Sequence, residues 1–171
     1  MSEYSTRKGY RDAFEVIGAL ADSGHPHRLK VAGRVQHQFR VEVDELVRRA
    51  PRPDRIDMLG FVENLPELYR GATAFLCCSR YEGFGLPVVE AMASGVPVVS
   101  YANSSLTEVV DDAGVLVPDG EIAAMIDATR AVVDAPSRQR DLREAGLDRA
   151  RAFSWDACAS IYADVFASVA R

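Results

Sequence analysis

Lysine is scarce in this sequence. Of its 20 basic residues only Lys8 and Lys30 are lysines, and the arginines are scattered through 171 residues that carry a net charge of −5. Nothing forms the basic stripe typical of a nucleic-acid-binding protein, so we predict no nucleic-acid partner. No apolar run approaches the roughly 18 residues of a membrane span, and residues 1–6 are polar, without the apolar core of a signal peptide. These absences predict a cytoplasmic protein without a transmembrane segment.

Cysteine is also scarce, and the three cysteines form no Cys-x-x-Cys pair of the kind used for zinc or redox chemistry. Cys77 and Cys78 are neighbours in an apolar run, and successive side chains of a strand point to opposite faces. We therefore expect them to be small buried residues in a reducing compartment, and assign no metal or redox role to them or to Cys158. The three histidines, His25, His27 and His37, lie in expected loops or at a helix start, and we predict no metal site from them.

The composition that remains, 48% apolar and 26% charged, is ordinary for a globular protein of one domain, here residues 1–171. Apolar periodicity alternates between helix and strand along the whole chain. Strands that alternate with helices and are apolar on both faces indicate a parallel sheet covered on each side, a doubly wound α/β fold. Expected strands are residues 28–32, 56–59, 74–78, 96–100 and 115–117; expected helices are residues 10–21, 39–50, 65–71, 87–94, a short one opening with a capping box at Ser105, 121–133, 137–153 and 155–170.

The most informative segment places two carboxylates, Glu82 and Glu90, around a glycine-rich turn. An apolar strand precedes this turn, and Pro87 begins a helical pattern after it. A turn of this kind directs free backbone N–H groups and the positive end of the helix dipole at one point, which suits a phosphate. Carboxylates accept hydrogen bonds from hydroxyls. A phosphate together with hydroxyls describes a sugar nucleotide.

This segment resembles the Glu-x7-Glu signature of the family 4 retaining glycosyltransferases, which have the GT-B fold. Four further motifs lie in that family's order and at its spacing, so the resemblance covers nearly all of the chain. They are Arg7-Lys8-Gly9, Leu59-Gly60-Phe61-Val62, Glu108-Val109-Val110 and Phe153-Ser154-Trp155, and Ala91 to Ser100 resembles the family's passage from helix to strand. The resemblance implies the C-terminal, donor-binding domain of such an enzyme, with a nucleoside-diphosphate sugar as substrate and no metal or other cofactor.

The resemblance also implies roles for single residues. Lys8 contacts the diphosphate and stabilises the charge that grows on the leaving group, as a compact ammonium can. Glu90 accepts the two ribose hydroxyls, and Glu82 holds the transferred sugar. Read without the resemblance, Lys8 is a solvated residue, Glu90 stabilises a helix N-terminus and Glu82 is a surface carboxylate.

The other expected donor contacts use the backbone. Gly83, Phe84, Gly85 and Leu86 offer N–H groups to sugar and phosphate oxygens, with the Phe84 ring packed in the core. Val62 lies beside the base, and Gly33 ends a strand where the nucleotide passes. Arg34 is either a diphosphate contact or a surface residue. The family often has two glycines where this chain has Ser104-Ser105.

Two parts expected from the family are missing here. The family's donor domain opens with a central strand that ends in Gly-Arg just before the lysine-glycine pair, and Met1 falls where that strand should end. A central strand, its arginine (unless Arg7 substitutes) and the acceptor domain are therefore expected to be absent. We predict that the chain alone is inactive and that its exposed apolar surface favours self-association.

Three other functions use the same features. A non-catalytic nucleotide-binding module or remnant would keep the same residues. A sugar-nucleotide epimerase or a phosphorylase has a related fold, although the wording Glu-Gly-Phe-Gly-Leu-Pro argues against it. A glycoside hydrolase also uses two carboxylates, but it has no need of the phosphate site that lies between them here.

Overall fold

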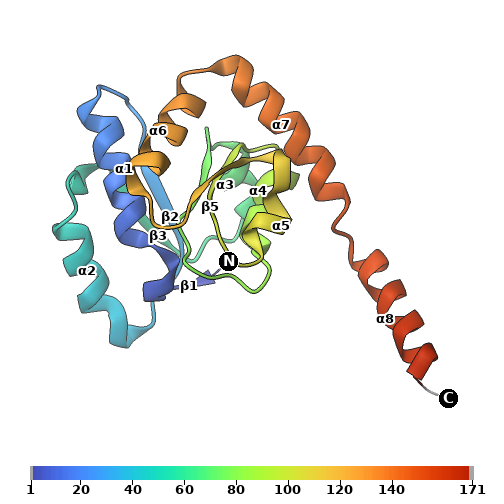
Figure 1. Cartoon of the computed structure of the whole chain (residues 1–171). Helices are drawn as coiled ribbons and strands as arrows, with labels where there is room; N and C mark the ends of the chain where they lie inside the picture. The colour runs from blue at the N-terminus through green and yellow to red at the C-terminus, as the bar shows by residue number, and fades with distance from the viewer. Residues whose placement is uncertain (1, 170–171) are drawn as a thin grey trace.

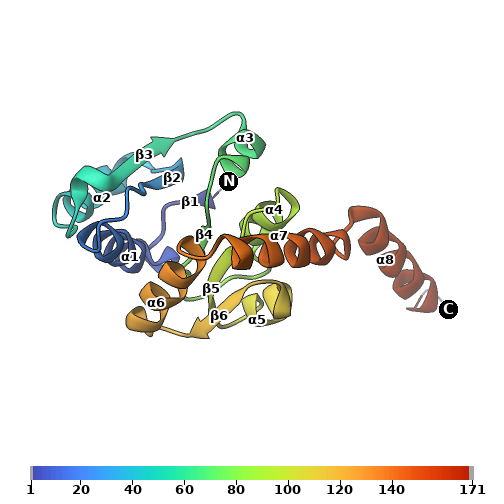
Figure 2. The same ribbon diagram turned by 90° about the horizontal axis from the view of Figure 1, so that it is seen from above.

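A parallel sheet divided into two halves forms the centre of the molecule (Figures 1 and 2). The computed structural model describes residues 2–169. Strands β1 (Ser2–Glu3), β2 (Leu29–Arg34) and β3 (Ile56–Gly60) form one half in that order, and β4 (Phe75–Cys77), β5 (Val98–Ala102) and β6 (Val115–Pro118) form the other. Every pairing between neighbouring strands is parallel. The predicted doubly wound α/β fold is confirmed.

Helices alternate with these strands as the apolar pattern predicts. Most of their ends lie within about two residues of the predicted ends, which is the usual uncertainty of a helix boundary. The end of the last predicted helix, residue 170, lies outside the described residues. The helices are α1 (Tyr10–Asp22), α2 (Arg40–Arg48), α3 (Leu65–Arg70), α4 (Leu86–Ala93), α5 (Leu106–Val110), α6 (Ile122–Val133), α7 (Pro136–Arg151) and α8 (Trp155–Val169), with short 3₁₀ turns at Thr6–Lys8, His37–Phe39, Pro53–Arg55 and Asp111–Ala113.

Two hydrophobic cores cover the two faces of the sheet. The first joins α1 and α6 to the strands, and Cys78 is buried in it. The second joins α4, α5 and the end of α7, and Cys77 is buried in it. The adjacent cysteines therefore do point to opposite faces, as predicted. Burial raises the pKa of both thiols, so each stays protonated and chemically inert at neutral pH.

The central position of the sheet is filled only at one end. β1 is two residues long and pairs with Gly33 and Arg34 at the carboxyl end of β2. Beside the rest of β2 no strand of the described chain pairs on the side toward β4, so the sheet is partial as expected. One detail was wrong: Gly33 does not end the strand, because the pairing with β1 carries β2 on to Arg34.

The last helix, α8, extends away from the body of the domain (Figures 1 and 2). None of its residues is buried, and its large apolar side chains are more than half exposed. These are Trp155, Ile161, Tyr162, Val165, Phe166 and Val169.

Candidate functional site

Lys8 and Glu82 meet at the carboxyl end of the sheet although 74 positions separate them in the sequence. The Lys8 Nζ lies 2.6 Å from Glu82 Oε1, and the two side chains are only 14% and 12% exposed. Lys8 ends the 3₁₀ turn before α1, and Glu82 lies in the loop between β4 and α4. The structure thus brings together the two residues to which we assigned diphosphate and sugar binding. It contradicts the alternative in which Lys8 and Glu82 are separate, solvent-exposed side chains.

Gly9 makes this approach possible. Its φ of 67° lies in the left-handed region, and a Cβ built on it would come within 1.9 Å of the Cys78 carbonyl oxygen. Only glycine at this position allows the start of α1 to lie so close to the end of β4. The Arg80 N–H donates to the carbonyl oxygen of Arg7 at 2.8 Å and ties the same two segments together.

A buried tyrosine and an arginine hold the start of α1 from the other side, a contact that the sequence did not reveal. Asp12 Oδ2 accepts hydrogen bonds from the Tyr101 hydroxyl and from Arg80 Nη2, each at 2.7 Å. The Arg80 guanidinium also lies 5.0 Å from the centre of the Tyr101 ring. Burial and the bond to Asp12 raise the pKa of Tyr101, so its proton stays available to Asp12. This network orients the turn that carries Lys8.

Two serines hold the backbone of Glu82. Its N–H donates to Ser104 Oγ at 3.0 Å, and its carbonyl accepts from Ser105 Oγ at 2.9 Å. Ser105 occupies the N-cap position of α5 as predicted, but the expected capping bond is absent, because its hydroxyl donates to the Glu82 carbonyl instead. Ser104 adopts a φ of 43°, a conformation that glycine would take without strain. Compared with two glycines, the two serines have less backbone freedom, but their hydroxyls fix the loop that carries Glu82.

Glu90 has a partner that the sequence analysis missed. The Tyr69 hydroxyl, from α3, donates to Glu90 Oε2 at 3.0 Å. Burial and the adjacent carboxylate raise the pKa of Tyr69, which keeps it protonated and able to donate. The tyrosine could have been suspected only from its place in the expected helix at residues 65–71. Glu90 is half-buried on α4, and among the described residues no hydrogen bond engages its other oxygen, Oε1.

The turn between the carboxylates is open to solvent. Gly83, Phe84 and Leu86 are exposed, whereas Gly85 is buried, has a φ of 91° and caps the N-terminus of α4. The expectation that Phe84 packs in the core was wrong: it is 42% exposed and meets Phe153 edge-to-face at 5.5 Å. The exposed backbone at the start of α4 is available to an anion.

The remaining predicted residues lie at the carboxyl end of the other half-sheet. Arg34 ends β2, Gly33 precedes it, and Val62 follows β3. The Arg34 guanidinium stacks on Phe61, 4.8 Å from the ring centre, so an aromatic ring holds it in place. Within the described residues no three His, Cys, Asp or Glu side chains gather in a way that could hold a metal ion. The expectation that no metal is needed stays a prediction.

Comparison with known proteins decides the family. The family profile described as glycosyl transferases group 1 matches residues 1–149.

The chain belongs to the group 1 glycosyltransferases. It is 41% identical over 116 residues to O-antigen chain mannosyltransferase B of Escherichia coli, covering 67% of this chain and 30% of that protein. It is 35% identical over 149 residues to the lipopolysaccharide core biosynthesis mannosyltransferase LpsB of Rhizobium meliloti, covering 82% and 42%. This glycosyltransferase chain therefore spans less than half the length of these relatives.

Solved structures agree on the fold. Alr3699/HepE of Anabaena, solved in complex with UDP, superposes with a TM-score of 0.84 at 20% identity, over 98% of this chain and 48% of that one. The architecture is that of the GT-B glycosyltransferases. No helix among residues 2–169 of this group 1 glycosyltransferase is long and apolar enough to cross a membrane.

Proposed function

We propose that this chain is the donor-binding domain of a retaining glycosyltransferase of family 4, which transfers a hexose from a nucleoside-diphosphate sugar. The observation that carries the proposal is the contact of 2.6 Å between Lys8 and Glu82 beside the start of α4. It places a cation, a carboxylate and free backbone N–H groups at one end of the sheet. These are the groups that a diphosphate and a sugar require.

The site's chemistry follows from that contact. Departure of a nucleoside diphosphate needs stabilisation of negative charge more than it needs a proton, and a preorganised cation supplies it. While no donor is bound, Glu82 neutralises the half-buried ammonium, since a buried charge without a partner is costly. When the diphosphate binds, Lys8 turns to it and Glu82 becomes free to accept hydroxyls of the sugar. Glu90 takes the ribose, sharing its carboxylate with Tyr69.

Known relatives support the choice of donor. One relative of similar fold is solved with UDP-glucose, and two relatives are mannosyltransferases by name. A hexosyl nucleotide therefore fits both the site and the family. Transfer itself needs the acceptor hydroxyl held near the anomeric carbon, and positioning of that kind supplies much of an enzyme's rate. We infer that a separate acceptor-binding domain performs that task, so this chain alone binds the donor without turnover.

Titration of the purified chain with UDP, GDP and ADP tests the proposal. We expect saturable shifts of the Lys8, Gly85 and Leu86 amides in NMR spectra, with a dissociation constant of about 0.1–1 mM, equivalent to roughly −4 to −6 kcal/mol. Lys8→Gln should weaken binding by about tenfold, because it removes a charge-assisted contact worth roughly 1.5 kcal/mol. Lys30→Gln removes the same charge from β2 and serves as the matched control.

A second candidate, a non-catalytic module of the same fold, predicts a different result. If no nucleotide saturates the site at several millimolar, or if both lysine variants weaken binding equally, the donor site assigned here does not exist.

A further inference from the structure

Two motifs of the sequence take no part in the proposed donor contacts. They are Glu108-Val109-Val110, which ends α5, and Phe153-Ser154-Trp155, which joins α7 to α8. In the structure both belong to a set of contacts around the glycine-rich turn at residues 83–86, which leads from Glu82 into α4. The N–H groups proposed to receive the donor lie in this turn, so whatever holds its shape bears on binding.

Phe84 ties the glycine-rich turn to the end of α7. It carries the one side chain of residues 83–85, and its ring meets Phe153 with the ring centres 5.5 Å apart and the ring planes at 84°. An edge-to-face pair of this kind is attractive beyond its apolar area, because the positive edge of one ring lies against the negative face of the other. Phe153 is half-buried against the second core, whereas Phe84 is 42% exposed. Phe153 is therefore the fixed member of the pair.

Arg149 connects Phe153 to α5. Its guanidinium lies 5.0 Å from the centre of the Phe153 ring. Its Nε donates to the Val109 carbonyl at 3.1 Å, and its Nη2 donates to the Glu108 carbonyl at 2.5 Å. These carbonyls lie in the last turn of α5, where the helix has no further N–H groups to offer them. One side chain thus holds both the Phe153 ring and the end of α5.

The start of α5 holds the other end of the glycine-rich turn. Ser105 Oγ donates to the Glu82 carbonyl at 2.9 Å. Leu106 lies so close to Gly85 that a Cβ built on this glycine would come within 2.9 Å of the leucine side chain. The two ends of α5 therefore reach the turn by two routes, one direct and one through Arg149 and Phe153, and the contacts form a closed ring.

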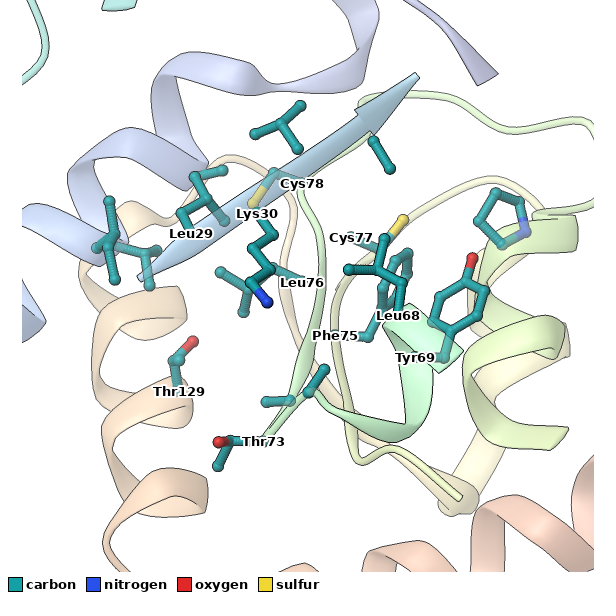
Figure 3. A pocket seen from close by; sticks show the side chains of 18 of the residues that line it. Leu29, Lys30, Leu68, Tyr69, Thr73, Phe75, Leu76, Cys77, Cys78 and Thr129 are labelled. Atoms are coloured by element: carbon teal, nitrogen blue, oxygen red, sulfur yellow. The ribbon is translucent and has the colours of Figure 1, made fainter. Parts of the chain in front are cut away.

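Glu90, which lies beyond the turn, has a separate support. Figure 3 shows Tyr69 of α3 beside Phe75 of β4, and their ring centres are 5.8 Å apart. The Tyr69 hydroxyl donates to Glu90 on α4 at 3.0 Å. The carboxylate assigned to ribose is thus held from the α3 side, whereas Phe153 holds the turn.

We propose that Phe153 is a positioning residue for the donor. Its ring holds Phe84, and so keeps the N–H groups of the glycine-rich turn in the arrangement that receives sugar and phosphate oxygens. This inference rests on the proposed function. A ligand that meets a preorganised loop avoids the free-energy cost of ordering that loop. Arg149 acts one step further back, because it holds Phe153.

Backbone order parameters of the chain without nucleotide test the first half of this inference. We expect NMR relaxation to give the amides of residues 83–85 order parameters above about 0.8, and values below about 0.6 in Phe84→Ala and in Phe153→Ala. Phe166→Ala is the matched control, because it removes an exposed ring that meets Tyr162 on the same helix, α8, and it should change nothing at the turn. Order parameters that are the same in all four proteins would overturn the inference.

A double-mutant cycle with UDP-glucose tests the second half. Phe84→Ala and Phe153→Ala should each weaken binding by about three- to tenfold, and the double variant should bind no more weakly than either, because all three lack the same contact. If the two losses instead add, Phe153 acts by loosening the second core and the inference is wrong. Phe84→Ala removes a well exposed ring, so it remains a test even if Phe153→Ala leaves a gap that impairs folding.

The cycle and the order parameters also separate this inference from the proposed function. A wild-type chain that binds no nucleotide counts against the donor site alone, and loss of order at the turn in both variants would still support its positioning by Phe153. A wild-type chain that binds UDP-glucose no better than either variant, once binding has been demonstrated, leaves the donor site in place and overturns the role of Phe153.

Discussion

At the scale of single residues, the carboxylates of the candidate site already have partners within the chain. Lys8 and Glu82 neutralise each other at 2.6 Å, and Tyr69 donates to Glu90 at 3.0 Å. Lys8 and Glu82 are therefore paired with each other, and one oxygen of Glu90 is engaged, before any ligand arrives. Under the proposed function, a donor would have to replace the contact between Lys8 and Glu82, so its affinity would be the difference between the new and the old hydrogen bonds.

Substitution of the two glutamates should distinguish the contribution of the ribose to binding from that of the transferred sugar. Glu90→Ala should weaken the binding of both UDP and UDP-glucose by about tenfold. Ribose is common to both ligands, and a hydrogen bond to a charged group contributes roughly 1.5–3 kcal/mol. Glu82→Ala should remove the preference for the sugar nucleotide while bare UDP binds at least as well, because Lys8 loses its internal competitor. Calorimetric titration of both ligands measures this.

Glu144→Ala, on the exposed face of α7, makes the same change of charge away from the site and should leave both affinities unchanged. Equal losses of both ligands in the Glu82 and Glu90 variants would show that the two roles are wrongly assigned.

A second residue-scale prediction concerns Gly9. Gly9→Ala should destabilise the fold by about 3 kcal/mol or more, because it combines a strained φ with a collision against the Cys78 backbone. Gly24→Ala shares the positive φ, at 87°, but its Cβ would meet nothing within 4 Å, so it should cost only about 1–2 kcal/mol. Urea unfolding measures both free energies of unfolding, and equal losses in the two variants would show that the contact of Gly9 with β4 does not contribute to stability.

At the scale of elements, α4 and α8 differ in what supports them. α4 packs Val88, Ala91 and Met92 into the second core, and so holds the carboxylates in place. α8 buries no residue within the domain. Its stability comes from its own backbone bonds and the Ser154 hydroxyl, which accepts from the Ala157 N–H at 3.0 Å.

Removal of α8 should therefore leave the domain intact. A chain that ends at Ser154 keeps the contact of Phe84 with Phe153 and should melt within about 2 °C of the full chain, because little apolar area is lost from the core. Self-association should decrease as the exposed apolar face of α8 disappears. Calorimetry and analytical ultracentrifugation check the two halves of this prediction, and a fall of about 10 °C in the melting temperature would contradict it.

At the scale of the whole molecule, buried phenols and thiols make stability depend on alkaline pH. Burial, with Glu42 as hydrogen-bond partner, raises the pKa of Tyr4 to about 12, and burial with an adjacent carboxylate also raises the pKa of Tyr69 and Tyr101. The folded state keeps these protons when the unfolded chain, with a tyrosine pKa near 10, has lost them. Their contribution to stability is complete below about pH 10 and is lost above it.

We expect the urea midpoint to begin to fall near pH 9, where the thiols of Cys77 and Cys78 titrate in the unfolded chain, and to fall steeply between about pH 10 and 12. Tyr101→Phe should reduce the slope. A midpoint that is the same at pH 8 and pH 11 would refute the assignment.

The sequence by itself determined the fold class and the order of the elements. Periodicities of 2 and 3.6 residues are local, and Pro87 and Gly85 mark the start of α4 through their own backbone preferences. The signature from Glu82 to Glu90 is local as well, so its strand, turn and helix were predictable.

Only the tertiary structure decided which residues contact each other. The contacts of Glu82 with Lys8, of Glu90 with Tyr69 and of Asp12 with Tyr101 join residues 74, 21 and 89 positions apart. No periodicity reports such separations. The same limit explains the errors: Phe84 was expected in the core, the Ser105 hydroxyl was expected to cap α5, and Gly33 was expected to end a strand. Each expectation was based on residues adjacent in the sequence. The observed contacts are instead with Phe153, Glu82 and β1, which are near only in space.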